Sequence, residues 1–232
     1  MTRSAERFAA VELDRQDKPK IGVVGEIYVR CHDFANSHVV RQLESLGAEG
    51  ALASFSEWMY YTNETRMWAA KREHSWYKLI QNSLKNRFQH NIERRLAKPF
   101  EPYFGRLVEP VVRHILELAR PYIHESFEGE AVLSVGKTLE FCHEGCDGVV
   151  NVMPFTCMPS TIVSGLMKKV SADLGGMPII SISYDGQQDP TLETRLEAFV
   201  HQARAYRRLR KRRGQAPPDR RDAKLQPQHA GD

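Results

Sequence analysis

The chain has 232 residues, of which 41% are apolar and 27% are charged, and its formal net charge is +4. This length supports a packed core, and no run of 18 or more apolar residues indicates a membrane span. Because residues 1–7 lack the apolar core of a signal peptide, we predict a cytoplasmic protein with no membrane partner. The positive charge is local: residues 204–232 hold 10 basic and 3 acidic side chains, which leaves 23 basic and 26 acidic ones elsewhere.

The first 54 residues predict a leading helix followed by a strand, a helix and a second strand. In chain order these are a helix at 6–13 within a leading segment 1–18, a strand at 20–28, a helix at 36–46 and a strand at 48–54. Gly47 is placed to end the second helix, as glycine commonly does just past a helix. A strand–helix–strand unit of these lengths is expected to be parallel and right-handed.

Residues 56–128 differ in character and predict a helical insertion. We expect one long helix at about 65–96, ended by Pro99 and Pro102, and a second at about 105–124. Large apolar side chains recur at helical spacing, and we interpret them as packed core rather than as a ligand wall. They are Trp58, Tyr60, Tyr61, Trp68, Trp76, Tyr77, Ile80, Leu84 and Phe88.

Strands and helices alternate again after residue 128. The predicted elements are helices at 130–143, 161–174 and 192–209 and strands at 149–153 and 178–184. We therefore predict the α/β class, with a four-stranded parallel sheet in a flavodoxin/Rossmann-like three-layer sandwich. The single α/β domain would span 19–210, with the insertion between strands two and three. Residues 211–232 read as a disordered basic tail, for which nucleic-acid binding is unlikely because no aromatic side chains are interleaved.

The main candidate site residue is Cys157. The strand at 149–153 stops at Pro154, and a helix opens near Pro159 or Ser160. Cys157 would then lie just beyond the carboxyl end of a parallel strand and beside a helix N-terminus. Open α/β sheets bind ligands at that edge, and a helix N-terminus stabilises a thiolate. The sequence therefore predicts a reactive or metal-binding thiol.

Two other strand ends should reach the same edge. The first strand delivers Glu26 and Arg30, and the last strand delivers Asp185. Convergence of a thiol, carboxylates and an arginine would make a binding site. Helix capping by Glu26 and turn formation by Asp185 are the alternative interpretations, and the sequence leaves both open.

The other cysteines are weaker candidates for metal binding. Cys142 and Cys146 are separated by four positions near a helix end, but the two-residue spacing of structural zinc sites is absent. Cys31 is the remaining one, and four cysteines in a cytoplasmic chain do not predict disulfides. Glycine-rich phosphate loops and a nucleophile-elbow sequence are also absent, which excludes the common nucleotide-binding and serine-hydrolase motifs.

Several runs together resemble the carboxyl-terminal region of 2-hydroxyacyl-CoA dehydratase-like proteins, in particular the acyl-CoA dehydratase activase-related proteins. The resemblance covers roughly residues 5–210, and the run Met153-Pro-Phe-Thr-Cys-Met-Pro159 is its most specific part. The other runs are Pro19-Lys-Ile-Gly-Val-Val-Gly-Glu-Ile-Tyr-Val-Arg30, Phe34-Ala-Asn36, Leu43-Glu-Ser-Leu-Gly-Ala48, Gly148-Val-Val-Asn-Val152, Ile182-Ser-Tyr-Asp-Gly-Gln187 and Thr194-Arg-Leu-Glu-Ala-Phe199.

This resemblance implies an iron–sulfur cluster, such as a 4Fe-4S cluster, and electron transfer driven by an ATP-dependent activator. Cys157 would be the ligand from this chain, and Glu26 and Asp185 would line the cluster or substrate pocket. The family's other cysteine ligands lie in an upstream α/β subdomain whose sequence is missing here, so a partner subunit or upstream domain would complete the site. The alternatives are a non-catalytic structural or interaction subunit and a truncated remnant without a cluster.

Overall fold

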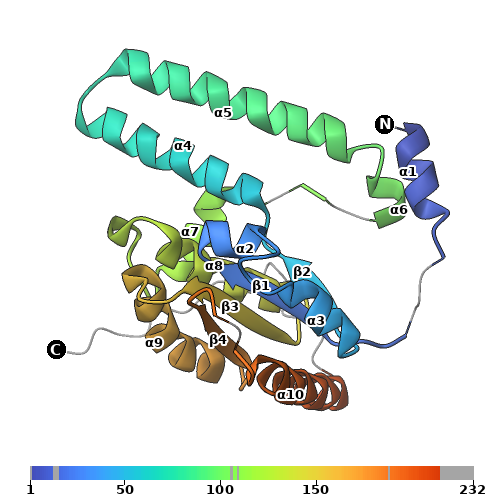
Figure 1. The fold of residues 1–232 in the computed structure, drawn as a ribbon. Coiled ribbons are helices and arrows are strands. Elements are labelled where there is room, and N and C mark those ends of the chain that lie inside the picture. The colour runs from blue at the N-terminus through green and yellow to red at the C-terminus, as the bar shows by residue number, and fades with distance from the viewer. Residues whose placement is uncertain (1, 13–15, 105–106, 109, 188, 215–232) are drawn as a thin grey trace. The chain divides into compact units, whose positions relative to one another are not determined.

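The structure is a computed structural model that describes residues 2–12, 16–104, 107–108, 110–187 and 189–214. The chain forms two compact units (Figure 1). One contains residues 1–17 and 54–112 and is helical, and we call it the helical unit. The other contains residues 18–53 and 113–232 and holds the sheet, and we call it the α/β unit.

The α/β unit is built on a four-stranded sheet in the order β2-β1-β3-β4. All neighbouring strands are parallel, which confirms the predicted fold class. The strands are β1 (Lys20–Gly25), β2 (Glu49–Leu52), β3 (Gly148–Pro154) and β4 (Ile179–Tyr184). The apolar run in β1 and β3 is continuous because both strands are central and are covered on both faces.

Helices cover the two faces of this sheet and form the outer layers of the sandwich (Figure 1). On one face, α3 (Val39–Ser45) and α10 (Leu192–Arg212) pack on side chains such as Val150 and Ile182. On the other, α8 (Glu130–His143) packs on β1 and β3, and α9 (Met158–Asp173) packs on β4. The remaining elements of this unit are α2 (Ile27–Cys31), α7 (Val112–Ala119) and η1 (Glu125–Phe127).

A buried carboxylate connects the start of β3 to the last helix. Asp147 is fully buried and accepts hydrogen bonds from the Lys20 backbone N–H at 3.0 Å and from Arg207 Nη1 at 2.7 Å. Arg210 Nη2 lies 2.9 Å from the other carboxylate oxygen. The sequence predicts that the last helix ends at about 209 and that a basic tail begins at 211. In the structure α10 continues to Arg212, and Arg207 and Arg210 of its basic run bind Asp147 beside β3. Residues 215–232 of the predicted tail lie outside the described residues.

The helical unit contains α1 (Thr2–Ala9), α4 (Phe55–Arg72), α5 (Trp76–Ala97) and α6 (Glu101–Phe104). The prediction of one long helix at 65–96 was wrong, because the chain turns back between α4 and α5. The turn closes as His74 adopts a left-handed conformation with φ of 54°, and the Ser75 N–H bonds the carbonyl of Ala70. No glycine or proline marks this turn, so its sequence signal is weak.

The predicted packing of the apolar stripe holds for α4 but not for α5. Tyr60 and Tyr61 on α4 are buried, whereas α5 has no buried residue at all. Trp76, Tyr77 and Leu84 are among its exposed side chains. Within the described residues, no helix has the length and apolar character needed to span a membrane.

Candidate functional site at the carboxyl edge of the sheet

The strand order creates a topological switch point between β1 and β3. From β1 the chain passes to β2 on one side, and later to β3 and β4 on the other. The carboxyl ends of these strands align, since Gly25 pairs with Val152 and Pro154 pairs with Tyr184. Ligands of open α/β sheets bind in the crevice outside such a switch point. The residues that follow β1, β3 and β4 are therefore the first place to look for a site.

Cys157 lies at this edge as the N-cap residue of α9, as the sequence predicts. Pro159 falls in the first turn of the helix, where its missing N–H costs nothing. The thiol is half-buried, and its Sγ accepts a hydrogen bond from Ser160 Oγ at 3.2 Å. Thr156, just before it, has φ of 64°, an unusual conformation for a β-branched residue. The thiol is therefore held in a defined position at the N-terminus of α9, with a hydroxyl donor against its sulfur.

A row of polar side chains extends from this thiol across the sheet, and sequence reasoning missed it. Ser164 Oγ lies 3.0 Å from Ser181 Oγ on β4, which in turn accepts from Asn151 Nδ2 at 3.2 Å. Asn151 is fully buried, and its Oδ1 has no hydrogen-bond partner among the described residues. The available sequence signal was the amide of Asn151 inside an otherwise apolar strand, because a buried polar side chain normally has a hydrogen-bond partner.

Glu26 and Arg30 gather with a third residue, Glu130, beyond the end of β1. The Glu26 carboxylate caps α2 by accepting from the backbone N–H groups of Tyr28 and Val29, as in the capping interpretation of the sequence. Burial raises the pKa of Glu130, and the negative charge of Glu26 raises it further, while Arg30 lowers it. Arg30 is 3% exposed. No local sequence pattern connects Glu130 with this edge, because it lies over 100 positions after Glu26.

A pocket of about 370 Å³ lies at the end of β4. Asp185 lines it, and the Asp185 carboxylate also accepts from the backbone N–H of Gln187, which fits the turn-forming interpretation. The Tyr184 hydroxyl is buried without a hydrogen-bond partner in the described part of the chain, and burial raises its pKa. Other lining residues are Ser37, Phe155, Ile182, Ser183, Gln187, Asp189 and Leu192. Its mixed polar and apolar wall suits a small molecule.

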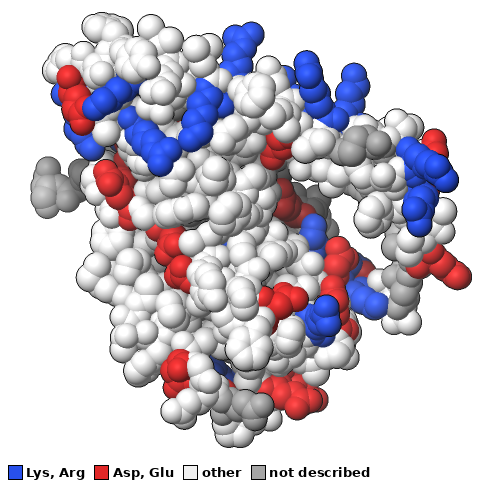
Figure 2. All heavy atoms as spheres, turned by 45° about the horizontal axis from the view of Figure 1, so that its top comes forward, with Lys and Arg blue, Asp and Glu red and all other residues white. Residues whose placement is uncertain are grey.

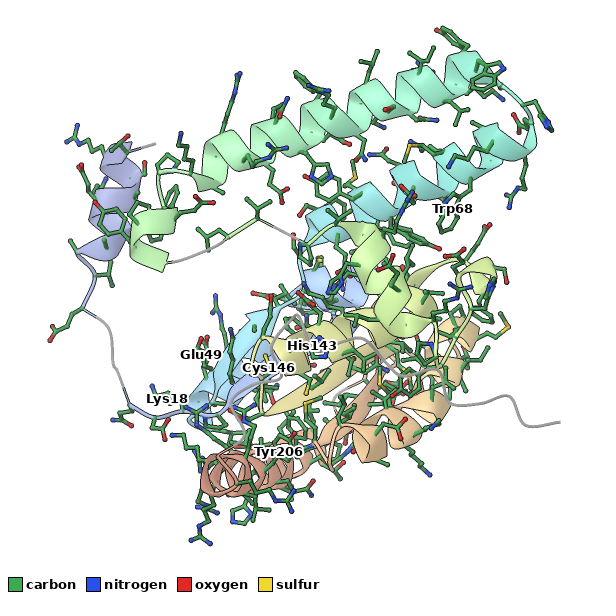
Figure 3. All side chains as sticks on the ribbon, turned by 180° about the vertical axis from the view of Figure 1, so that it is seen from behind. Lys18, Glu49, Trp68, His143, Cys146 and Tyr206 are labelled. Carbon is green, nitrogen blue, oxygen red and sulfur yellow. The ribbon has the colours of Figure 1, made fainter. Side chains whose placement is uncertain are left out.

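Cys142 and Cys146 do not belong to this edge. Cys146 precedes β3, at the amino end of the sheet, where Lys18 and Glu49 also lie (Figure 3). Since β3 spans seven residues, or roughly 20 Å, Cys146 cannot share a small cluster with Cys157. Burial in an apolar cluster raises the pKa of Cys142 and raises that of Cys146 to about 12. Both behave as packing thiols.

Cys31 ends α2, the helix that begins beyond the carboxyl end of β1, and it is exposed. All four cysteines are free of disulfides. Among the described residues no group of three or more His, Cys, Asp or Glu side chains is arranged to hold a metal ion. One thiolate at this edge fits cluster ligation, but these residues do not supply the usual four ligands of a cubane.

Comparison with known proteins gives no relative. No family model, no curated protein and no solved structure matches this chain.

Proposed function

We propose that this protein is a redox component of the 2-hydroxyacyl-CoA dehydratase and activase-related type, and that its carboxyl edge provides one thiolate to a shared iron–sulfur cluster. The observation that carries the proposal is the position of Cys157. It is half-buried at the N-terminus of α9, accepts a hydrogen bond from Ser160, and follows a strand beside the switch point.

The other ligands would come from a partner subunit or an upstream α/β subdomain that faces this edge. When bound, such a cluster supplies low-potential one-electron transfer, and the proposed source of the electron is an ATP-dependent activator. Glu26, Arg30 and Asp185 would flank the cluster or a substrate. Because Glu26 already caps α2 and Asp185 already closes a turn, each would act with its carboxylate orientation fixed by the backbone.

The test is anaerobic co-production of the full chain with its partner chains, followed by iron and sulfide analysis and an optical spectrum. We expect Cys157→Ser to remove most of the cluster. The control is Cys142→Ala, which changes a packed thiol that does not belong to this edge. Cluster content that is the same in the Cys157→Ser assembly as in the unaltered one would refute the ligand assignment.

The second candidate function is an interaction subunit without a cluster. The observation in its favour is that the described residues hold no group of three side chains able to bind a metal. Absence of iron from the intact assembly, together with normal assembly of Cys157→Ser, would favour this second candidate.

A further inference from the structure

Several polar contacts join α4 and α5. Tyr60 on α4 donates to the Glu93 carboxylate at 2.8 Å, and Asn63 donates to Gln89. The Tyr60 ring also stacks on His90 with ring centroids 4.1 Å apart, and His90 Nδ1 lies 3.6 Å from Glu93. Hydrogen bonds and ring stacking are therefore part of the contact between these helices, on the side where an amphipathic hairpin usually places its apolar residues.

The large apolar side chains of α5 lie on the opposite side. Trp76, Tyr77, Ile80, Leu84 and Phe88 are each 60–77% exposed. At 3.6 residues per turn they fall within an arc of roughly 120°, and the residues that contact α4 fall outside it. We call these five residues the α5 apolar face. A contiguous exposed face of this kind on a soluble unit indicates an interaction site.

The charges of α5 are almost all positive. The helix carries five basic residues, Lys78, Lys85, Arg87, Arg94 and Arg95, of which Lys78 forms an ion pair with Glu73 at 2.6 Å. Its only acidic residue is Glu93, which is held by Tyr60 and His90 in the contact with α4. Figure 2 shows Lys and Arg side chains along the upper part of the molecule, with uncharged side chains between them. A second copy of α5 would bring like charges together, whereas an acidic partner would gain from this arrangement.

A separate apolar groove lies on the α4 side of the same helix and is not part of the α5 apolar face. It has a volume of about 720 Å³, and its walls include Met59 and Tyr60 from α4 and Gln89, Ile92 and Leu96 from α5. From Trp76 to Phe88 the α5 apolar face extends roughly 18 Å at 1.5 Å per residue. This length equals about three turns of a partner helix lying along it.

We propose that the α5 apolar face binds an acidic amphipathic helix of a partner protein. Apolar side chains spaced by three or four residues are the pattern through which helices recognise one another, and the basic residues beside them select an acidic partner. The inference does not depend on the role of Cys157, because it rests only on the helical unit.

The probe is a fluorescein-labelled 20-residue peptide with Leu at helical spacing of three and four and Glu at most other positions. Its control has Lys in place of Glu. We expect saturable binding of the Glu peptide to the full chain by fluorescence anisotropy, weakening with added salt, and no binding of the Lys peptide. Leu84→Ser should weaken binding about tenfold or more, because a buried leucine is lost from the contact.

The matched control is Leu209→Ser on α10, which changes another exposed leucine, outside the helical unit, and should leave binding unchanged. Arg87→Glu should weaken binding of the Glu peptide, whereas Leu209→Ser should not. Both altered side chains on α5 are exposed, so the fold should persist, and circular dichroism checks this.

Three results would overturn the proposal. Equal binding of the Glu and Lys peptides would show that charge does not select the occupant. A dimer in sedimentation that Leu84→Ser abolishes would assign the face to a second copy. Co-sedimentation with vesicles containing anionic lipid, lost in Leu84→Ser and without peptide binding, would assign it to a lipid surface.

Discussion

Asp147→Asn should be one of the most damaging isosteric changes in the α/β unit. The carboxylate is fully buried between the start of β3 and the end of α10, where it faces Arg207 and Arg210. Asparagine keeps one oxygen to accept the Lys20 N–H, but its NH2 group then faces Arg210 Nη2. The change therefore removes the negative charge and one hydrogen-bond acceptor.

The expected cost follows from burial of the two arginines. Removing one partner of a buried ion pair costs about 3–5 kcal/mol, because the remaining charge is left uncompensated. Here the Arg207 and Arg210 side chains retain 21% and 12% exposure, and Arg210 keeps its bonds to the carbonyls of Gly145 and Cys146. We therefore expect a smaller loss, about 2–3 kcal/mol.

The assay must report on the α/β unit. All three tryptophans, Trp58, Trp68 and Trp76, lie in the helical unit, so their fluorescence would follow the wrong part of the chain. Hydrogen exchange of peptides from β1 and β3 reports the opening of the sheet directly. A loss of about 2–3 kcal/mol corresponds to exchange that is about 30- to 150-fold faster.

The matched control is Asp173→Asn, which changes an aspartate paired with Lys169 at 2.9 Å on the surface. Exposed ion pairs contribute little, so this variant should exchange like the unaltered protein. If Asp147→Asn accelerates exchange no more than Asp173→Asn does, the buried charge is not what holds α10 to the sheet.

Two further expectations test the cysteine assignments and the edge geometry. In native protein at pH 8, iodoacetamide should label Cys31 within minutes and leave Cys142 and Cys146 unlabelled, because burial protects these two thiols and raises their pKa values. Mass spectrometry gives the order of labelling, and rapid labelling of Cys146 would contradict this expectation. Gly25→Ala should destabilise the sheet by about 2 kcal/mol or more in the same exchange assay, because φ is 126° and the added Cβ would lie 1.9 Å from a β3 carbonyl oxygen. Gly175→Ala, with φ of 69° and open space around it, should cost less, and equal costs would refute the close-approach argument.

Local sequence pattern determined the sheet and much of the position of Cys157. β-branched residues such as Val149 and Val150 favour a buried central strand, and Pro154 followed by Pro159 indicates where β3 ends and α9 begins. The capping role of Glu26 and the turn at Asp185 also follow from neighbours within three positions. These features depend on contacts close in sequence, which is why one sequence could predict them.

Tertiary structure alone decided the features that join distant segments. Packing between elements far apart in the chain brings Glu130 near Glu26 and forms the ion pair of Arg207 with Asp147. It also decides that the α5 apolar face points outward. Apolar residues at helical spacing predict that one face of a helix packs against another element, but they do not predict which element covers it. For α5 that partner is not α4, because Gln89 and Glu93, which contact α4, lie outside the arc of the α5 apolar face.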